Sequence, residues 1–494
     1  MEYQEIAGRM PEKVFQYFKA ISRIPRGSGN TKAVSDYCMA FAKERGLVCR
    51  QDEACNVVII KEASPGYGEA PTVMLQGHLD MVCAKDSSVS HDFEKDPLKL
   101  VLDGDYIRAE GTTLGADNGI AVAYALAVLD SDDLPHPRLE CVFTSDEETG
   151  MVGANALDMS GFQASFLLNL DSDNEGVFQV GCAGGIRCNL TVPMSWEKRR
   201  GIPVRIWLHG LSGGHSGVDI GLGRGNAVLL TARILDELLR AAGNQVSVCG
   251  MRGGTQDNVI PSDCVLDIMA DAGGLETVRE AAASMEAVFR KEYPVTDPGL
   301  KLEVSCGEEA QEGTALTVRS AAALRAFLLN APNGVQAMNQ QLPGQVKTSL
   351  NLGIFKLEQN GSVSASFLIR SDLHTEKQAL CRRLETYADY FGGAYGTAGD
   401  YPEWEYVPQS PLRELLCQVY REQYGSEAKM ETIHGGVECG LFAAGIPGLD
   451  AVSMGPQMEG IHTSRERLSI SSVNRFWNFL TEVLRRMNQM ECKR

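Results

Sequence analysis

Apolar and polar positions follow two different periods along the first 170 residues of the chain. Residues 11–22 (PEKVFQYFKAIS) repeat apolar side chains at helical spacing, and a second helix is predicted from Thr31, as its cap, to about Glu44. A hairpin is expected at 103–110, before an alanine-rich apolar helix at 120–129. Further apolar runs predict strands at 56–61, 73–75, 139–144 and 164–170. Because strands and helices alternate, we expect an α/β domain with a mixed, largely parallel sheet covered by helices.

The character of the chain changes near residue 184. From there to about residue 404, strands are predicted at 204–208, 265–269 and 363–369, and amphipathic helices at 226–239, 275–293, 320–329 and 375–390. After Pro408 the α/β pattern returns, with helices at 411–424 and 473–490 and a strand near 449–454. We therefore expect one discontinuous α/β domain, residues 1–183 and 405–494, with an inserted α+β domain at 184–404.

Length and charge narrow the class of protein. A chain of 494 residues is too long for a single compact core, which agrees with two domains. The net charge of −18 argues against binding to nucleic acids or anionic membranes, since both require basic patches. Such acidity mostly serves solubility, although acidic residues also build sites for divalent cations.

The cysteines and the first residues indicate a cytoplasmic protein. The 14 cysteines form no C-x-x-C pair, which disfavours a zinc ribbon or a dithiol redox site. The stretch MEYQEIAGRMPEKVF lacks the apolar core of a signal peptide. No run of about 18 apolar residues is present to span a bilayer. A protein with reduced thiols in the cytoplasm is therefore expected.

The stretch TVMLQGHLDMV, residues 72–82, carries the first candidate chemistry. Side chains alternate along a strand, so His78 and Asp80 point to the same side. A histidine with a carboxylate two positions on is typical of a metal ligand and its orienting partner. By itself, however, such a pair is more often an ordinary feature of a strand end.

Further acidic residues and a second histidine stand at the ends of predicted elements. Asp117 begins a helix, Glu147 and Glu148 follow one strand, Asp171 ends another, and His462 lies in a glycine-flanked loop. Each has a plainer explanation: a helix cap for the first, solvated turns for the other carboxylates and surface exposure for the histidine. In α/β sheets, however, functional residues gather at the carboxyl ends of strands, where most of these lie.

Taken together, these residues have the composition of a two-metal site. Two histidines and three carboxylates supply nitrogen and oxygen ligands for two divalent ions, provided that one carboxylate bridges them and one position is left for water. Zinc suits this ligand set, and manganese or cobalt would also fit. Such a site activates water and polarises a carbonyl, and the spare glutamate of the Glu147-Glu148 pair could act as general base.

The chain resembles a known family, the aminoacyl-histidine dipeptidases (cytosolic Xaa-His dipeptidases) among the dinuclear zinc peptidases. The matching stretches span nearly the whole chain in the family's order: GHLDMV (77–82), GTTLGADNGIAVA (111–123), TSDEETGMVGA (144–154), NLDSD (169–173), GGHSGVDI (213–220), RGNAV (224–228), HGGVECGLF (434–442) and GIHTSRERL (460–468).

The resemblance implies roles for the residues of the metal site. Two zinc ions would be held by five ligands, of which Asp117 would bridge both ions: His78, Asp117, Glu148, Asp171 and His462. Asp80 would orient His78, and Glu147 would be the general base.

The resemblance also assigns the inserted domain, which would be a lid and a dimerisation domain, so that a homodimer is expected. From this domain His215 would stabilise the oxyanion, while Asn258 and Arg370 would hold the C-terminal carboxylate of the substrate. Gly436 would line the substrate pocket. Read without the resemblance, His215 among glycines indicates a flexible turn, and Arg370 at a strand end indicates a surface salt bridge.

Three stretches depart from the family's pattern. Asp173 stands where the family commonly has glutamate, residues 258–262 read NVIPS in place of NAIPR, and residues 462–466 read HTSRE in place of HSPDE. No proposed ligand is removed, but the preferred substrate side chains stay open.

The sequence therefore predicts a metal-dependent hydrolase of dipeptides, with Xaa-His dipeptides such as carnosine as the expected substrates. A related tripeptidase or N-acyl amino-acid deacylase is the alternative that would share the metal site. The alternative from another class is a non-catalytic binding protein on the same scaffold.

Overall fold

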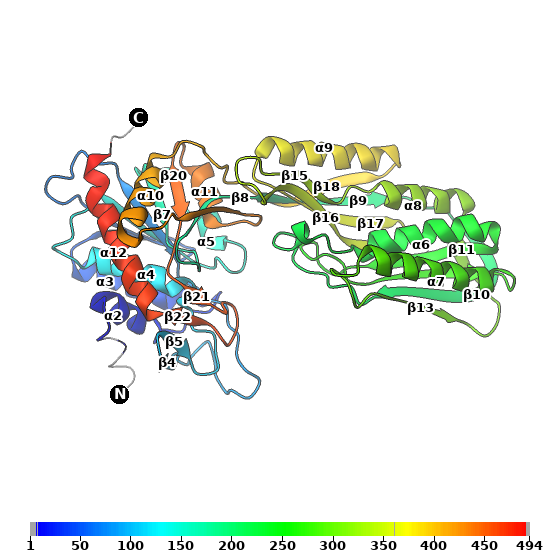
Figure 1. The fold of residues 1–494 in the computed structure, drawn as a ribbon, viewed down its shortest axis with the longest axis horizontal. Coiled ribbons are helices and arrows are strands. Elements are labelled where there is room, and N and C mark those ends of the chain that lie inside the picture. The colour runs from blue at the N-terminus through cyan, green and yellow to red at the C-terminus, as the bar shows by residue number, and fades with distance from the viewer. Residues whose placement is uncertain (1–5, 7, 360, 491–494) are drawn as a thin grey trace. The chain divides into compact units, whose positions relative to one another are not determined.

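The computed structural model describes residues 6, 8–359 and 361–490 and divides into two compact units (Figure 1). The first unit comprises Met1–Gly181, Tyr406–Thr432 and Val437–Arg494, and the second comprises Cys182–Glu405 and Ile433–Gly436. The short segment Ile433–Gly436 therefore groups with the second unit, although it lies in the sequence range expected for the first.

The first unit is built on an eight-stranded mixed sheet. Its strands, in spatial order, are β1 (Val48–Gln51), β2 (Val57–Lys61), β6 (Leu139–Thr144), β3 (Val73–His78), β7 (Phe166–Asn169), β20 (Asp450–Ser453), β8 (Val177–Cys182) and β19 (Lys429–Ile433). The central pairs β6–β3, β3–β7 and β7–β20 are parallel, whereas β1–β2, β2–β6 and β20–β8 are antiparallel. The central strands β3 and β6 are buried along their whole length, as expected of parallel strands covered on both faces.

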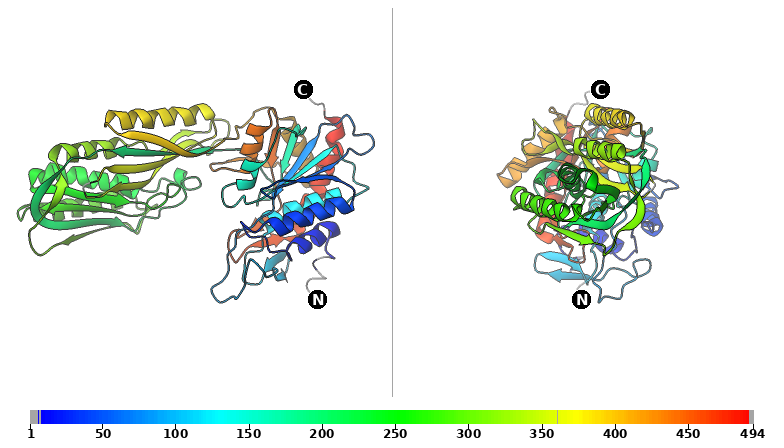
Figure 2. Two further views of the ribbon diagram at one scale, coloured as in Figure 1. Left: turned by 180° about the vertical axis from the view of Figure 1, so that it is seen from behind. Right: turned by 90° about the vertical axis from the view of Figure 1, so that its right-hand side faces the viewer.

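Helices cover this sheet on both faces (Figure 2). They are α2 (Glu12–Ile21), α3 (Lys32–Glu44), α4 (Ala116–Leu129), α5 (Val152–Ala156), α10 (Pro411–Tyr424), α11 (Glu438–Gly445) and α12 (Ile470–Arg486). The predicted helices are present, but Thr31 makes no side-chain capping bond to α3. The first residues of α4 are kinked, with non-helical φ and ψ at Asp117 and Asn118, and its regular part lies close to the predicted range 120–129. Nearly every residue of α4 is buried, because the helix packs against β3 and α2, and Tyr124 contacts Val473 and Phe476 of α12.

A small four-stranded sheet ties the C-terminal part of the chain to the predicted hairpin. Its order is β21 (Met458–Glu459), β22 (Arg467–Ser469), β5 (Tyr106–Ala109) and β4 (Leu100–Asp103). The loop between β21 and β22 carries His462, so this sheet fixes the loop that supplies the second histidine.

The second unit is a ten-stranded sheet with helices on one side (Figures 1 and 2). The strands are β9 (Gly184–Val192), β10 (Trp196–His209), β11 (Val246–Gly253), β12 (Cys264–Ala270), β13 (Lys301–Cys306), β14 (Gln311–Leu316), β15 (Gly334–Met338), β16 (Val346–Leu357), β17 (Val363–Ser371) and β18 (Ala394–Tyr401). The helices are α6 (Ala227–Ala241), α7 (Gly274–Glu292), α8 (Val318–Asn330) and α9 (His374–Tyr390). All four helices share one hydrophobic core with alternate residues of the strands, which confirms the predicted α+β class of this region.

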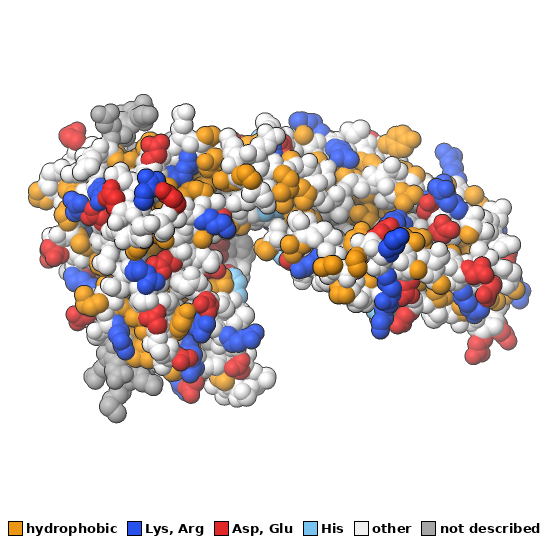
Figure 3. Space-filling view, in the orientation of Figure 1, with side chains coloured by type: hydrophobic (Ala, Val, Ile, Leu, Met, Phe, Trp, Pro, Cys, Tyr) orange, Lys and Arg blue, Asp and Glu red, His pale blue; other side chains and the backbone are white. Residues whose placement is uncertain are grey.

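On the face drawn in Figure 3, lysine and arginine side chains are interspersed with aspartate and glutamate over both units, without a single large basic area. Within the described residues, none of the helices combines the length and the apolar character that a bilayer crossing requires.

Candidate functional site

The parallel strands of the first unit bring most of its predicted residues to one edge of the sheet. His78 ends β3 and is paired with Thr144, the last residue of β6, while Gln76 is paired with Asn169 at the end of β7. Since parallel strands end at the same edge, the loop after β6, with Glu147 and Glu148, and the loop after β7, with Asp171, emerge beside His78.

Asp117 lies between the two predicted histidines. Its Oδ1 is 3.2 Å from Nε2 of His78, and its Oδ2 is 3.1 Å from Nε2 of His462. Nε2 of His462 is also 3.0 Å from Oε1 of Glu148, and Nε2 of His78 is 3.6 Å from Oδ1 of Asp171. One carboxylate therefore contacts both imidazoles, and each imidazole has a second carboxylate beside it.

Electrostatics at this cluster favour positive charge. Burial opposes the charged form of His78, but three neighbouring aspartates outweigh it and raise the pKa of the imidazole well above its ordinary value. Hydrogen bonds with Asp117 and Glu148 raise the pKa of His462 to about 10. Burial raises the pKa of Asp171 to about 6. The carboxylates thus draw cations to the histidine nitrogens, and the closely grouped donor atoms of His78, Asp117 and Glu148, all within 4.8 Å of one another, fit a metal ion.

His462 is held in an unusual backbone conformation. Its φ is +62°, in the left-handed region that residues other than glycine rarely adopt. The preceding turn is closed by bonds from the backbone N–H and the hydroxyl of Thr463 to the carbonyl of Gly460. Such strain is typical of functional positions, and here it accompanies an imidazole that contacts both Asp117 and Glu148.

Asp80 lies behind His78 and is fully buried. Its Oδ1 is 3.2 Å from Nδ1 of His78, the ring nitrogen that faces away from Asp117. The same carboxylate accepts hydrogen bonds from the backbone N–H groups of Glu147 (3.0 Å) and Glu148 (3.2 Å) and from the hydroxyl of Ser28 (2.8 Å). Asp80 therefore links the histidine at the end of β3 to the loop after β6, a geometry that suits an orienting residue better than a ligand.

Glu147 has the electrostatic character of an acid–base group. Burial, with smaller contributions from neighbouring carboxylates, raises the pKa of its side chain to about 9. Enzymes tune carboxyl groups in this direction when they must exchange protons near neutral pH. Its backbone is fixed by Asp80 on one side and by hydrogen bonds from the N–H groups of Gly150 and Met151 to its carbonyl on the other.

Two residues that the sequence did not single out support the metal cluster. The side chain of Asn118 accepts a bond from the backbone N–H of His78 (3.1 Å) and donates to the carbonyl of Leu170 (2.8 Å), so it joins the ends of β3 and β7. A Cβ at Gly77 would overlap Asn118 and Ala121, so only glycine allows α4 to approach β3 this closely. The DNG sequence at the start of α4 was the available signal.

Glu438 is a buried carboxylate that was not predicted from the sequence. Its Oε2 accepts hydrogen bonds from Nε2 of Gln76 (2.5 Å) and from the hydroxyl of Thr144 (2.8 Å). Burial raises its pKa to about 7. It lies within the HGGVECGLF stretch and braces β3 and β6 just before their carboxyl ends.

In the second unit, the structure brings His215 and Arg370 together. Arg370 lies near the end of β17 and is 5% exposed, which contradicts its alternative interpretation as a surface salt bridge. Its Nη1 donates to the hydroxyl of Tyr401 at 2.8 Å, and its Nη2 is 3.3 Å from Nε2 of His215. Tyr401 was not predicted; it occupies the space that a side chain at Gly185 would need.

Backbone N–H groups of the loop around His215 face one nitrogen of its ring. The backbone N–H groups of Gly217 and Val218 lie 3.2 and 3.3 Å from Nδ1, which therefore acts as an acceptor. Burial, followed by the charge of Arg370, lowers the pKa of the imidazole. Nε2 of the same ring faces the guanidinium of Arg370, which can only donate, so the contacts at the two ring nitrogens do not fix a single tautomer.

Asn258 and Gly436 are less closely tied to this group. The carbonyl of Asn258 accepts a bond from the backbone N–H of Ser216 at 2.8 Å, but the residue lines a separate pocket of about 460 Å³ together with Arg187 and Lys356. Gly436 ends the segment Ile433–Gly436. The structure gives no direct contact between either residue and Arg370.

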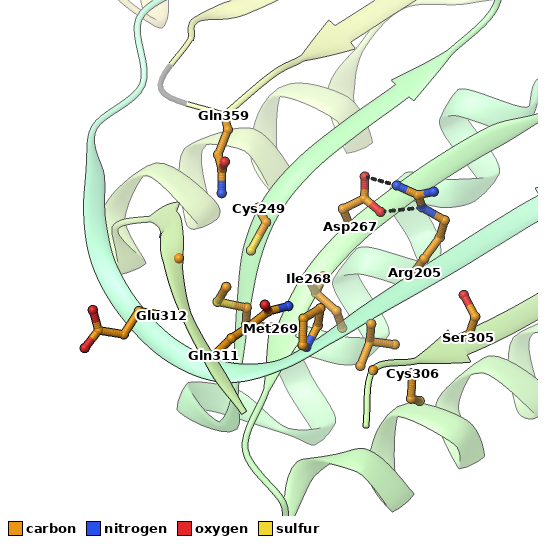
Figure 4. A pocket seen from close by; sticks show the side chains of 14 residues that line it. Arg205, Cys249, Asp267, Ile268, Met269, Ser305, Cys306, Gln311, Glu312 and Gln359 are labelled. Atoms are coloured by element: carbon orange, nitrogen blue, oxygen red, sulfur yellow. Dashed lines mark hydrogen bonds and ion pairs between the residues drawn. The ribbon is translucent and has the colours of Figure 1, made fainter. Parts of the chain in front are cut away.

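A further pocket of about 560 Å³ on the second unit contains none of the predicted residues (Figure 4). Arg205 and Asp267 pair along its wall through two hydrogen bonds, and Cys249, Met269 and Cys306 also line it. The pairing satisfies both charges, so the pocket offers no free charged group of this pair to a ligand.

The family model described as peptidase family M20/M25/M40 matches residues 74–486. Among curated proteins, the cytosol non-specific dipeptidase of Escherichia coli (strain K12) is 34% identical over 486 residues, which covers 97% of this chain and 99% of that protein.

Solved structures show the same likeness. The aminoacylhistidine dipeptidase of Vibrio alginolyticus matches with a TM-score of 0.88 and 33% identity over 97% of each chain. Aminopeptidase PepT of Bacillus cereus matches with a TM-score of 0.55 and 16% identity, over 97% of this chain and 99% of that one, a likeness that concerns the fold alone.

Proposed function

Because the chain belongs to peptidase family M20/M25/M40, we propose that it is a metal-dependent dipeptidase that hydrolyses the peptide bond of small dipeptides. The observation that carries the proposal is the contact of one carboxylate, that of Asp117, with both His78 and His462. The two full-length relatives, the Escherichia coli protein and the Vibrio structure, are both named dipeptidases, which supports the substrate class.

The donor set supports two divalent ions. We propose that His78 and Asp171 would hold one ion and that Glu148 and His462 would hold the other, while Asp117, which contacts both histidines, would serve both. Imidazole and carboxylate ligands suit zinc, and manganese or cobalt remain alternatives that metal analysis would distinguish. Metal chemistry at such a site consists of polarising the substrate carbonyl and making a water molecule more acidic.

In the proposed mechanism Glu147 moves the proton. Its carboxylate takes a proton from the attacking water, whose oxygen forms the new bond to the peptide carbon. When the C–N bond breaks, the same group returns the proton to the leaving amine. Burial raises the pKa of this group to about 9 when no ion is bound, and the charge of two divalent ions beside it would lower the pKa toward neutrality, where a carboxylate can both take and return a proton.

His215 and Arg370 are proposed to bind the substrate. His215 would donate a hydrogen bond from its imidazole to the oxygen that becomes negatively charged. Arg370 would bind the free carboxylate of the substrate with its guanidinium fork, and Tyr401 holds one arm of that fork in place. Recognition of a free carboxylate would place the cleaved bond close to the C-terminus of the substrate. Asn258 and Gly436 stay predictions for the same substrate.

A substrate panel tests the proposed activity. Metal-loaded protein would be assayed side by side with carnosine, other Xaa-His dipeptides, dipeptides without histidine, a tripeptide and an N-acetyl amino acid. We expect dipeptides to be cleaved and Xaa-His to be preferred; equal rates on all dipeptides would contradict only the histidine preference. Faster cleavage of the tripeptide or the N-acetyl amino acid would favour those rival functions, and a lack of any hydrolysis would favour a binding protein.

Replacing Asp80 with asparagine is expected to lower zinc affinity or turnover by about 10- to 100-fold, as is usual for residues that orient a metal ligand. The amide offers one acceptor oxygen where the carboxylate serves His78, Ser28 and two backbone N–H groups. Zinc titration of the purified variant measures the effect, and thermal unfolding checks the fold. Asp36→Asn, at an exposed aspartate of α3, is the matched control. Unchanged affinity and turnover in the Asp80 variant would show that Asp80 does not orient His78.

Replacing Arg370 with lysine is expected to raise KM for dipeptides about tenfold, because a lysine keeps the charge but not the fork. The C-terminal amides of the same dipeptides, which lack the carboxylate, should show no comparable change. Steady-state kinetics on both substrate sets measure the difference. Arg325→Lys, at a partly exposed arginine of α8, is the control. Equal effects on acids and amides would contradict the assigned role.

We further propose a cytoplasmic homodimer in which the second unit acts as lid and dimerisation domain. The word "cytosol" in the name of the Escherichia coli relative supports the location. Analytical ultracentrifugation of the full chain tests the dimer, which a monomer at micromolar concentration would contradict.

A further inference from the structure

We propose that Glu466 is a positioning residue, whose carboxylate fixes the backbone of Leu114–Asp117 and thereby aims the Asp117 side chain at both histidines. The inference rests on the proposed function, in which Asp117 is the shared metal ligand. Glu466 itself touches neither imidazole in the described contacts, so its effect would pass through the loop before α4.

The carboxylate of Glu466 is buried, and both of its oxygens accept hydrogen bonds. Its side chain is 2% exposed, and each carboxylate oxygen accepts two backbone N–H groups. Oε2 accepts from Leu114 (2.7 Å) and Gly115 (2.9 Å), and Oε1 accepts from Ala116 (2.7 Å) and Asp117 (3.2 Å). The N–H groups at the start of a helix have no partner within the helix, so one side chain here satisfies four consecutive donors.

One loop contacts both the side chain and the backbone of Asp117. The segment between β21 and β22 carries His462, whose Nε2 is 3.1 Å from Oδ2 of Asp117, and Glu466, whose Oε1 accepts from the backbone N–H of Asp117. A carboxylate that merely stabilised α4 could come from any neighbouring segment. Because this loop also carries His462, it contacts both the side chain and the backbone of Asp117 through two residues only four positions apart. The loop therefore sets the distance between the proposed ligands His462 and Asp117.

Arg26 holds the opposite side of the same loop. Its buried guanidinium donates to the carbonyls of Leu79 (2.9 Å), Asp80 (3.0 Å) and Gly115. Gly115 has a φ of +64°, and a Cβ there would lie 2.6 Å from Nη2 of Arg26. The chain just beyond His78 is thus tied to the loop before Asp117 by Arg26, while Glu466 ties that loop to His462.

The test compares Glu466→Gln with Glu459→Gln. Glu459 lies on β21, where it pairs with Arg467 at the surface, so it provides a matched change in the same region. An amide presents one oxygen and one NH2 group, so two of the four backbone donors would face a donor. We expect at least about tenfold weaker zinc binding in Glu466→Gln and an altered visible absorption spectrum of the cobalt-loaded protein. Glu459→Gln should match the unmodified protein in both measurements.

The outcomes separate this inference from the proposed function. If Asp117→Asn loses metal while folded Glu466→Gln binds zinc and cobalt like the unmodified protein, only the positioning role is overturned. If Asp117→Asn itself keeps both ions, the assignment of Asp117 as the shared metal ligand is wrong, and with it the proposed function of the site.

If Glu466→Gln does not fold, hydrogen–deuterium exchange of the unmodified protein tests the positioning role of Glu466. The amides of residues 114–117 are expected to exchange as slowly as those within α4, because the carboxylate occupies them. Exchange as fast as in an exposed loop would overturn the proposal.

Discussion

Glutamine in place of Glu147 is expected to lower dipeptide turnover by about 100- to 10,000-fold, the usual contribution of a general acid–base group. The amide has nearly the same shape but cannot take a proton from water or deliver one to the leaving amine. Metal content should be unchanged, because the hydrogen bond to Asp80 comes from the backbone of residue 147. The kcat on an Xaa-His dipeptide and elemental analysis of the same sample give the two values.

A matched change is Glu44→Gln, at a glutamate near the end of α3 whose side chain is 75% exposed. It should leave both kcat and metal content unaltered. Retention of activity in Glu147→Gln, with normal metal content, would refute the assigned role of Glu147. Loss of metal together with activity would instead identify Glu147 as part of the metal-binding shell.

Asparagine in place of Asp117 is expected to cost the protein its bound metal and at least about 1,000-fold in turnover, equivalent to about 4 kcal/mol. Asp117 is the single carboxylate that contacts both imidazoles, one through each oxygen. In the variant an NH2 group replaces one of these oxygens, so the carboxylate charge is lost and one histidine faces a donor. Elemental analysis after dialysis against buffer with limiting zinc measures the loss.

Asp36→Asn serves again as the control for a surface aspartate, with metal content and kcat expected to be normal. Binding of two ions per chain by Asp117→Asn would contradict the bridging role. Circular dichroism and thermal unfolding of the variant check that the fold is kept, because Asp117 lies between the buried residues Ala116 and Asn118.

Much of the first unit could be predicted from the sequence, because its elements have clear periods. β3 and β6 are short runs buried on both faces, and α4 is apolar all round, so each stands out from its flanking polar loops. The kink at the start of α4 was not predicted, because the non-helical backbone of Asp117 and Asn118 leaves no trace in the apolar pattern.

The second unit was harder to predict. Its sheet has ten strands, of which the sequence pattern identified only three. Strands such as β10, which begins WEKRRG, and β18 (AYGTAGDY) are largely polar and partly exposed. Such strands are stabilised by pairing with neighbours rather than by a buried apolar run, and pairing partners cannot be identified from a single strand.

The candidate site divides in the same way. The residue types and their order, from His78 to His462, indicated a metal-binding set before any contact was known. The supporting residues Tyr401 and Glu466 are of ordinary types, and their hydrogen bonds to partners far away in the chain could not be predicted from the sequence.

The sequence by itself thus determined the class of fold, the chemistry of the donor atoms and the family to which the chain belongs. Only the tertiary structure decided that Asp117 lies between two histidines 384 residues apart in the chain, that Asp80 faces Nδ1 rather than the metal side of His78, and that Glu466 holds the loop of Asp117. The physical reason is that residue types fix which bonds can form, whereas the parallel order of β6, β3 and β7 and the small sheet around β22 fix which donors and acceptors meet.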